Sequence, residues 1–376
     1  MCDVQVDCQL PGGNIVVDQI QDGLVRVHQD LRDTQGDWFY WYFRLRGGAG
    51  RTLRIEFTNG NVVGVLGPAV SDDAGATWRW LGRQACLENG FAYEPSAGAA
   101  ETRFCVAVPY VQADLHRFLQ RFEGSALLRQ EVLCRTGKGR EVEMLRLGRL
   151  DGRCRHRLLV VCRHHCCEMM ASFVLEGILQ TVLSDAPLGR WFQDCVEVLA
   201  IPFVDKDGVE DGDQGKNRRP HDHNRDYGDE SIYSSVRAIR ELVPAWSAGR
   251  LKLALDLHCP YIRKGRSEEP FFVQAAAGDS WGQIERLTRL LAAARTGPIP
   301  LKSQSNLPFG QEWNTDDGGM CRSFSRWASE LPGVRLACTL EIPYALAGGC
   351  EVTPESARAF GLDLAAAIHR VLEDEE

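Results

Sequence analysis

Cysteine pairs in the CxxC spacing are absent from this chain. It contains 14 cysteines among 376 residues, but no two of them stand in the CxxC spacing. In a long chain, scattered cysteines of this kind are typical of buried, reduced thiols rather than of a disulfide framework. The opening residues, MCDVQVDCQLPGG, also lack the basic segment and the apolar core of a signal peptide, so we expect a cytoplasmic protein.

Long apolar runs and basic, aromatic-rich stretches are missing as well. No run approaches the roughly 18 apolar residues that would indicate a membrane span. The net charge is −8 and no basic stretch is interleaved with aromatic residues, which argues against nucleic acid as a partner. The residues that are present, 44% hydrophobic and 25% charged, are typical of a globular protein, and the length suggests two or three domains. The oligomeric state does not follow from these numbers.

The first third of the chain is predicted to form short β-strands. Segment 52–60 alternates apolar and polar residues and ends on Asn-Gly, which is a turn signal. Segments 37–47, 71–82 and 101–110 contain aromatic or apolar residues in a similar alternation, with turn residues between them. Strands of this length separated by turns predict an antiparallel β-sandwich over residues 1–112.

Beyond residue 112 the pattern changes to alternating strands and helices. Segment 157–163 is a short, continuous apolar run, which is expected of a strand covered on both faces. Further strands are predicted at 195–204, 252–258 and 337–343, and helices at 114–124, 169–185, 230–247, 280–295 and 354–376. Residues 113–376 are therefore predicted to form an α/β/α domain with a mixed, largely parallel sheet.

Three groups of metal-binding side chains follow the predicted strands. His165 and Glu168 come after the strand at 157–163, His258 ends the strand at 252–258, and Glu341 ends the stretch 337–341. Ligands bind outside the carboxyl ends of the strands in such sheets, so these groups are expected to converge. A catalytic zinc ion takes three protein ligands and leaves one position open, and His165, Glu168 and His258 supply such a set.

Other interpretations of the same segment are open at this point. His164 is an alternative to His165, although the His-x-x-Glu spacing favours His165. Cys166 and Cys167 could bind zinc as thiolates, but no second cysteine pair completes a structural site. His165 and Glu168 could also merely cap the following helix. The polar, Asp- and Arg-rich stretch 201–228 is typical of a loop that binds an anionic ligand, or of a solvated loop.

Several motifs, taken in order, resemble those of the zinc carboxypeptidases, specifically the cytosolic carboxypeptidase-like branch of the metallocarboxypeptidases. The resemblance covers nearly the whole chain, because the amino-terminal sandwich and its tryptophan-rich strands are also features of that branch. The matching segments are SDDAGATW (71–78), PYVQADL (109–115), HCCE (165–168), KDGVEDG (206–212), NRR (217–219), DHNRDY (222–227), LDLHCP (255–260) and TLEIP (339–343).

The resemblance implies a carboxypeptidase-like fold for the second domain and one Zn²⁺ per chain. His165, Glu168 and His258 would bind the zinc ion, and Asp222 would orient a zinc-binding histidine. Glu341 would be the general base on the activated water and then the proton donor to the leaving amine.

The resemblance also implies residues that hold the substrate. Asn224 and Arg225 would bind its terminal carboxylate, where a guanidinium offers two parallel hydrogen bonds. Arg218 or Arg219 would polarise the scissile carbonyl, and the spacing does not decide between them, although we prefer Arg218.

Two features of the family cannot be placed from the sequence. Tyr344 and Tyr261 are candidates for the tyrosine that covers the bound substrate. The basic residues after His258, namely Arg263, Lys264 and Arg266, could select an acidic terminal residue or could form a solvated loop.

The sequence thus predicts a zinc-dependent carboxypeptidase that acts on a peptide or protein C-terminus, or on a peptide-like side-chain amide. A zinc-dependent deacylase of small N-acyl amino acids and a non-catalytic binding protein are the alternatives. A cysteine hydrolase using Cys259 beside His258 is disfavoured, because adjacent residues of a strand point to opposite faces.

Overall fold

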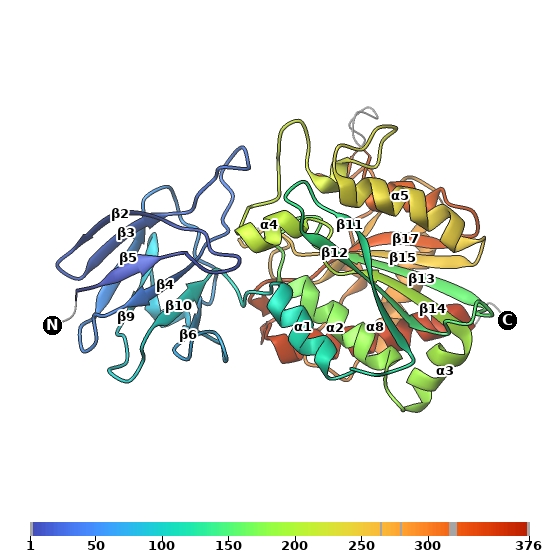
Figure 1. Ribbon diagram of the computed structural model, residues 1–376, viewed down its shortest axis with the longest axis horizontal. Helices are drawn as coiled ribbons and strands as arrows, with labels where there is room; N and C mark the ends of the chain where they lie inside the picture. Colours follow the sequence, from blue (N-terminus) through green and yellow to red (C-terminus); the bar gives the residue numbers. More distant parts are fainter. Residues whose placement is uncertain (1–2, 264, 279, 316–321, 374–376) are drawn as a thin grey trace.

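The computed structural model describes residues 3–263, 265–278, 280–315 and 322–373. In these residues the chain forms two parts that lie side by side, an amino-terminal pair of β-sheets and a larger α/β part (Figure 1). The change from one to the other falls between Cys105, where the last strand of the first part ends, and Gln112, where the first helix begins. No helix among the described residues is long and apolar enough to cross a membrane.

The first part is a sandwich of two five-stranded sheets, in the orders β1-β4-β10-β6-β7 and β2-β3-β5-β9-β8. The pairs within both sheets are antiparallel except β3 with β5, which are parallel. The antiparallel prediction is therefore wrong for this one pair. The strands are β1 (Gln5–Asp7), β2 (Val16–Gln21), β3 (Leu24–His28), β4 (Tyr42–Arg46), β5 (Leu53–Phe57), β6 (Ala69–Ser71), β7 (Arg79–Trp80), β8 (Cys86–Leu87), β9 (Gly90–Tyr93) and β10 (Thr102–Cys105).

Aromatic rings fill the space between the two sheets. The Trp41 ring lies 4.9 Å from the Phe57 ring and 6.1 Å from the Phe91 ring, measured between centroids. The predicted strand at 37–47 is shorter in the structure, where only Tyr42–Arg46 forms β4. Just before β4 the chain contacts the second part: the Tyr40 backbone N–H donates a hydrogen bond to the Gln214 side chain.

The second part is built on a seven-stranded mixed sheet in the order β11-β12-β14-β13-β15-β17-β16. Its four central strands, β14, β13, β15 and β17, run parallel, and the three outer strands pair antiparallel. The central strands are buried along their whole length apart from one position, as expected where helices cover both faces. The strands are β11 (Leu128–Arg135), β12 (Glu141–Gly148), β13 (His156–Cys162), β14 (Val196–Ile201), β15 (Leu251–His258), β16 (Phe271–Gln274) and β17 (Leu336–Glu341), with a small hairpin of β18 (Leu346–Ala347) and β19 (Cys350–Glu351).

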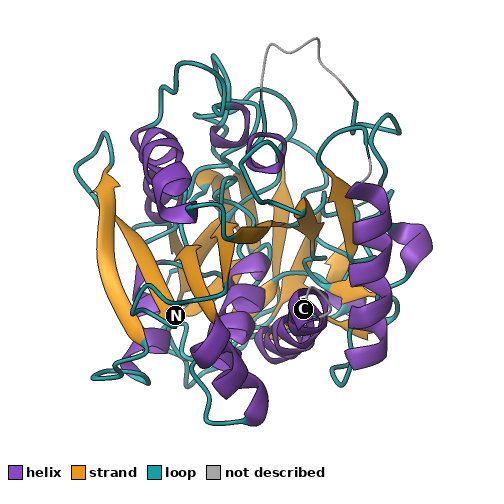
Figure 2. Cartoon of the chain, turned by 90° about the vertical axis from the view of Figure 1, so that its right-hand side faces the viewer, coloured by secondary structure: helices purple, strands orange, loops and turns teal. Residues whose placement is uncertain are grey.

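Helices cover both faces of this sheet, which confirms the predicted α/β/α architecture (Figure 2). Helices α2, α3, α6 and α8 share one apolar core with the sheet, while α5 and α7 pack on the opposite face. The bounds are α1 (Gln112–Gln120), α2 (Met170–Val182), α3 (Pro187–Cys195), α4 (Lys206–Asp211), α5 (Ser234–Ser247), α6 (Ser280–Ala294), α7 (Phe324–Ser329) and α8 (Pro354–Glu373).

The parallel strands bring the predicted site residues to one edge of the sheet. His258 and Glu341 are the last residues of β15 and β17, and they are direct partners in the register of that pair. The loop that contains His165 follows β13, which is the neighbour of β15 on its other side. Groups that are far apart in the sequence therefore meet at the carboxyl ends of three adjacent strands.

Candidate metal centre

The three predicted zinc ligands converge in the structure. His165 Nδ1 lies 3.0 Å from Glu168 Oε1 and 3.1 Å from His258 Nδ1, and His258 Nδ1 lies 2.6 Å from Glu168 Oε2. All three side chains are buried. His165 and Glu168 lie in the short loop between β13 and α2, so the end of one strand and the approach to one helix set their spacing.

The donor atoms fit a zinc ion. Two ring nitrogens and a carboxylate face one point, and zinc is bound by imidazole nitrogen and carboxylate oxygen. Two imidazole nitrogens 3.1 Å apart compete for the same carboxylate, and a shared cation would satisfy all three groups at once. A buried carboxylate oxygen of Glu341, Oε2, also lacks a hydrogen-bond partner among the described residues.

A carboxylate stands behind each of the two imidazoles. His258 Nε2 lies 2.8 Å from Asp256 Oδ2, and His165 Nε2 lies 3.5 Å from Asp222 Oδ1. Burial alone would raise the pKa values of Asp222 and Asp256, but the neighbouring histidines outweigh burial and hold both below the ordinary value. Such partners fix the ring orientation and direct the two Nδ1 atoms to the cluster.

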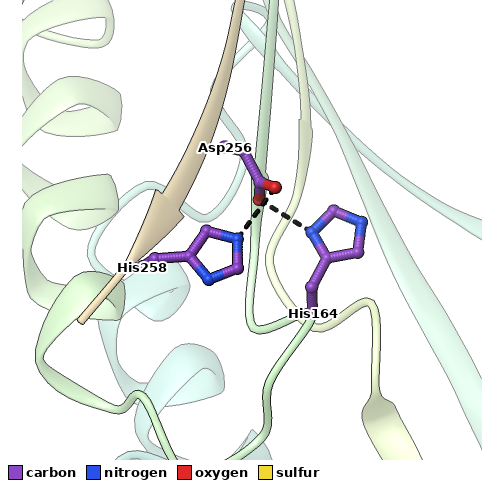
Figure 3. A group of neighbouring side chains, drawn as sticks. All are labelled: His164, Asp256 and His258. Carbon is purple, nitrogen blue, oxygen red and sulfur yellow. Dashed lines mark hydrogen bonds and ion pairs between the residues drawn. The ribbon is translucent and has the colours of Figure 1, made fainter. Parts of the chain in front are cut away.

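Asp256 also connects the cluster to the rival histidine (Figure 3). His164 Nδ1 lies 2.7 Å from Asp256 Oδ1, and His164 Nε2 lies 2.8 Å from the Tyr227 hydroxyl. Both ring nitrogens of His164 therefore have partners of their own. This supports His165 as the ligand, although His164, Asp256 and His258 also form a compact group of potential ligand atoms.

Glu341 lies beside the cluster in a position suited to a general base. It is buried at the end of β17, and its side chain lines the same cavity as His165 and His258. Burial raises the pKa of Glu341 to about 7; the charge of Glu168 adds to this rise, while the charge of His258 opposes it. A base that exchanges its proton near neutral pH is suited to accept a proton and return it.

The cluster opens into a cavity of about 750 Å³. Of the predicted substrate-binding residues, Asn224 and Arg225 line this cavity. Asn224 Nδ2 lies 3.2 Å from His258 Nε2, and Asn224 Oδ1 accepts a hydrogen bond from the Phe324 backbone N–H. Arg225 is exposed and donates a hydrogen bond to the Asn224 backbone carbonyl, so its guanidinium stands at the mouth of the cavity.

Arg218 and Arg219 are not among the described residues that line the cavity. Arg218 lies 2.9 Å from Asp33, 2.8 Å from Asp205 and 3.0 Å from Asp213, so three carboxylates occupy its guanidinium. Arg219 is exposed. Neither arginine therefore lines the cavity as the described residues form it, and the contact of Arg218 with Asp33 is one reason.

Lys216 and Trp38 are among the lining residues that sequence reasoning missed. The Lys216 ammonium lies 2.6 Å from Glu168 Oε1 and 5.1 Å from the centre of the Trp38 ring. Burial alone would lower the pKa of Lys216, but the charge of Glu168 outweighs burial and raises it. The signal was present in the sequence, because Lys216 directly precedes the NRR motif in the same polar loop.

The remaining candidate residues are two tyrosines and two cysteines, and most of them are hydrogen-bonded to backbone carbonyls. Tyr344 is buried and donates a hydrogen bond to the Cys167 carbonyl, while Tyr261 lines the cavity and donates to the Asp37 carbonyl. The Cys166 thiol donates to the Asp213 carbonyl. Burial raises the pKa of Cys167 to about 12, and neither cysteine belongs to the groups of potential ligand atoms found among the described residues.

The basic residues after His258 differ from one another in their contacts. Arg263 and Arg266 both line the cavity. Arg263 donates a hydrogen bond to the Val63 carbonyl of the sandwich, and Arg266 pairs with Glu312 at 2.8 Å. Lys264 lies outside the described residues.

Solved structures with the same fold exist, although no protein-family model matches the chain and no curated protein sequence is significantly similar to it. The chain is similar to a metallo-carboxypeptidase from Burkholderia cenocepacia, with a TM-score of 0.80, 18% identity and 100% of both chains covered. It is also similar to a metallo-carboxypeptidase from Pseudomonas aeruginosa in complex with (2-guanidinoethylmercapto)succinic acid, with a TM-score of 0.79, 17% identity and coverage of 99% and 100%.

The carboxypeptidase A from Helicoverpa armigera matches a smaller share, with a TM-score of 0.51, 13% identity and coverage of 70% and 73%. At these identities the likeness establishes a common fold. The predicted carboxypeptidase-like fold is therefore confirmed over the whole chain, sandwich included. The assignment to the cytosolic branch and the roles of the site residues stay predictions.

Proposed function

We propose that this protein is a zinc-dependent metallocarboxypeptidase that hydrolyses a C-terminal peptide bond or a peptide-like side-chain amide. The observation that carries the proposal is the convergence of His165, Glu168 and His258 on one point, where the two histidines line the same cavity as Glu341. The shared fold with solved metallo-carboxypeptidases supports the same assignment.

In this proposal His165 Nδ1, Glu168 and His258 Nδ1 hold the metal ion. When bound there, zinc would supply Lewis-acid chemistry, lowering the pKa of a water molecule and polarising the scissile carbonyl. The chain's own residues do the rest. Asp222 and Asp256 keep both rings turned with Nδ1 towards the metal, and Glu341 accepts the proton of the attacking water and delivers it to the leaving nitrogen.

The mouth of the cavity would hold the end of the substrate. Arg225 stands there with an exposed guanidinium beside Asn224, and this pair is suited to bind a carboxylate. Two further arginines, Arg263 and Arg266, line the same cavity and add positive charge. A substrate that carries a free terminal carboxylate matches this charge distribution.

The experiment that tests the proposal is mass spectrometry of a mixed peptide library after incubation with zinc-loaded protein. A sample treated with a chelator and a Glu341→Gln variant serve as controls. We expect chelator-sensitive loss of single C-terminal residues, and the residues lost would reveal the preferred terminus. If zinc binds at one per chain without cleavage, the deacylase alternative gains support, and the absence of both cleavage and zinc would favour a non-catalytic binding protein.

The Glu341→Gln variant makes a separate prediction. It should retain zinc, because the three ligands are unchanged, yet its kcat should fall by about 10² to 10⁴-fold, the usual contribution of a general base. Zinc content by elemental analysis and peptide turnover would be measured on the same sample. Turnover at the wild-type rate would exclude Glu341 as the base.

A further inference from the structure

Amide hydrolysis at this site needs a positive charge that stabilises the oxyanion, and the predicted arginine is not available for it. Arg218 is held by three aspartates outside the cavity. We propose that Lys216 supplies this charge, and that Trp38 of the amino-terminal sandwich holds it in place. The inference rests on the proposed function and concerns the same cavity.

The position of Lys216 fits this role. Its ammonium lies 2.6 Å from Glu168 Oε1, so it stands directly beside the metal cluster. Its side chain is 16% exposed and lines the cavity, and the Glu168 side chain with which it pairs is fully buried. An oxyanion that forms on a carbonyl next to the cluster would therefore lie close to a fixed positive charge, and such charges are most effective where water is excluded.

Glu168 does not remove Lys216 from consideration. This carboxylate carries a single negative charge, and in the proposed enzyme the metal ion would share it. The Lys216 ammonium has three donor hydrogens, so pairing with Glu168 leaves two that can reach another acceptor. Arg218, in contrast, already directs Nε, Nη1 and Nη2 at carboxylates.

The other cations of the cavity have different placements. Arg266 pairs with Glu312, and Arg263 donates to a carbonyl of the sandwich. Arg225 is exposed and donates a hydrogen bond to the Asn224 carbonyl. This exposed position suits a residue that binds the substrate's terminal carboxylate. Lys216 instead pairs directly with a predicted zinc ligand.

Trp38 acts as the positioning residue for Lys216. Its ring lies 5.1 Å from the ammonium nitrogen, within the range of a cation–π interaction. The ring is itself fixed, because Tyr261 packs edge-on against it at 5.8 Å and donates a hydrogen bond to the Asp37 carbonyl. The sandwich thus contributes one wall of the active site.

The test compares Lys216→Met with Lys216→Arg, and uses Lys138→Met as the matched control, because Lys138 is exposed in the β11–β12 turn and pairs with Asp211. Four quantities are measured on zinc-loaded protein: the zinc dissociation constant, kcat, KM, and the affinity of a peptide phosphonate that imitates the tetrahedral oxyanion. The peptide is one that the wild-type protein is shown to cleave.

We expect Lys216→Met to bind zinc as tightly as the wild type or more tightly, since a competing charge beside Glu168 is gone. Its kcat should fall by about 10² to 10³-fold, as when an oxyanion donor is removed. The phosphonate should bind more weakly by a similar factor, while KM changes little. Lys216→Arg should recover part of kcat, and Lys138→Met should match the wild type throughout.

Trp38 is tested through the same readouts. Trp38→Leu should lower kcat and phosphonate affinity by about tenfold at unchanged zinc affinity, because the cation–π contact that holds the ammonium is lost. Trp38→Phe should restore much of the loss, since it keeps an aromatic face.

Several outcomes would overturn the inference. A rise in KM at constant kcat would make Lys216 a carboxylate-binding residue, and a loss of zinc would make it a support for the ligand set. Unchanged kcat and phosphonate affinity in Lys216→Met would remove it from the site's chemistry. If the wild-type protein neither cleaved a peptide nor bound the phosphonate, the proposed function would fail first and this inference with it.

Discussion

At the scale of single residues, the candidate metal centre depends on which nitrogen of each imidazole faces the cluster. Asp256 and Asn224 both contact His258 Nε2, and Asp222 approaches His165 Nε2, so the Nδ1 atoms are left to face each other. The carboxylates behind the rings therefore matter almost as much as the ligands themselves.

Removing one of these carboxylate charges should weaken metal binding without touching a ligand. We expect Asp256→Asn to lower the affinity for zinc by about 10 to 100-fold, because an amide stabilises the metal-facing form of His258 less well. Titration of the apoprotein with zinc measures the change. Asp194→Asn, at an exposed position, is the control, and equal affinities for both variants would show that Asp256 does not orient the ligand.

The shifted pKa of His223 predicts how the stability of the protein depends on pH. Burial and the adjacent Arg218 guanidinium lower the pKa of His223 from 6.5 to about 4, although Asp205 opposes this shift. Between these values the unfolded state binds a proton that the folded state does not. Stability is therefore fully present above pH 6.5 and is lost as the pH falls towards 4.

The size of this loss follows from the pKa difference and amounts to roughly 3 kcal/mol. Urea unfolding at pH 7 and at pH 4 measures this loss of stability, which should occur in the wild type and be absent in His223→Gln. His116→Gln, at a largely exposed histidine, should follow the wild type. If the free energy of unfolding depended on pH in the same way in the wild type and in His223→Gln, the prediction would be contradicted.

The predictable residues are those whose position is set by a strand end. His165, Glu168, His258 and Glu341 converge because parallel strands end at one edge of the sheet, and this follows from the pattern alone. No prediction was made for Lys216, and the aspartate contacts of Arg218 were not foreseen. Their contacts depend on Trp38 and Asp33, which come from the other part of the chain, and no local pattern specifies such a contact.

At the scale of elements, the buried parallel strands and the long helices match their predictions closely. The prediction of a helix at 169–185 is matched by α2, and the strand at 252–258 by β15. The hairpin of β11 and β12 was missed. β11 lies at the edge of the sheet, and its exposed residues interrupt the alternation of apolar and polar side chains that identifies a strand. Helix α3, which begins at Pro187, was missed as well.

Helix α2, which follows the ligand loop, crosses α8 at very short range. A Cβ atom on Gly177 would lie 2.1 Å from the Arg358 carbonyl oxygen, and one on Gly361 would lie 2.1 Å from the Val174 carbonyl oxygen. The two glycines therefore allow the backbones to touch. Because α2 begins two residues after Glu168, this crossing also fixes the approach of that ligand.

Adding a methyl group at this crossing should push the helices apart. We expect Gly177→Ala to lower the free energy of unfolding by about 1–3 kcal/mol, as overpacking in a dense core does. Gly282 in α6 is the matched control, since a Cβ there meets nothing within 4 Å. Gly282→Ala should be neutral or stabilise by up to about 1 kcal/mol, the helix preference of alanine. Equal results for both variants would show that the crossing tolerates a wider spacing.

At the scale of the whole molecule, the sandwich and the α/β part are joined by buried polar contacts. Asn14 donates a hydrogen bond to the Gly212 carbonyl, and the Asp33 carboxylate accepts hydrogen bonds from the backbone N–H groups of Gln214 and Gly215. These contacts hold the loop that continues to Lys216 and Asp222. The sandwich thus shapes the candidate site through this loop as well as through Trp38.

Arg218 carries the positive charge at the centre of this junction. Replacing it distinguishes a structural role in the junction from the predicted role at the scissile carbonyl. Arg218→Met would leave Asp33, Asp205 and Asp213 close together without their shared cation. Removing one partner of a buried ion pair costs about 3–5 kcal/mol, so the free energy of unfolding should fall by that amount. Limited proteolysis should then cut between the sandwich and the α/β part.

Chemical denaturation measures the stability, and Arg140→Met, in a partly exposed ion pair with Asp207 and Asp211, is the control with a smaller expected loss. Activity of Arg218→Met should fall only as far as the folded fraction falls, because its guanidinium does not line the cavity. A variant that kept wild-type stability but lost kcat would place Arg218 at the scissile carbonyl, as the motif pattern alone suggests. This result would also remove the reason for assigning the oxyanion-stabilising charge to Lys216.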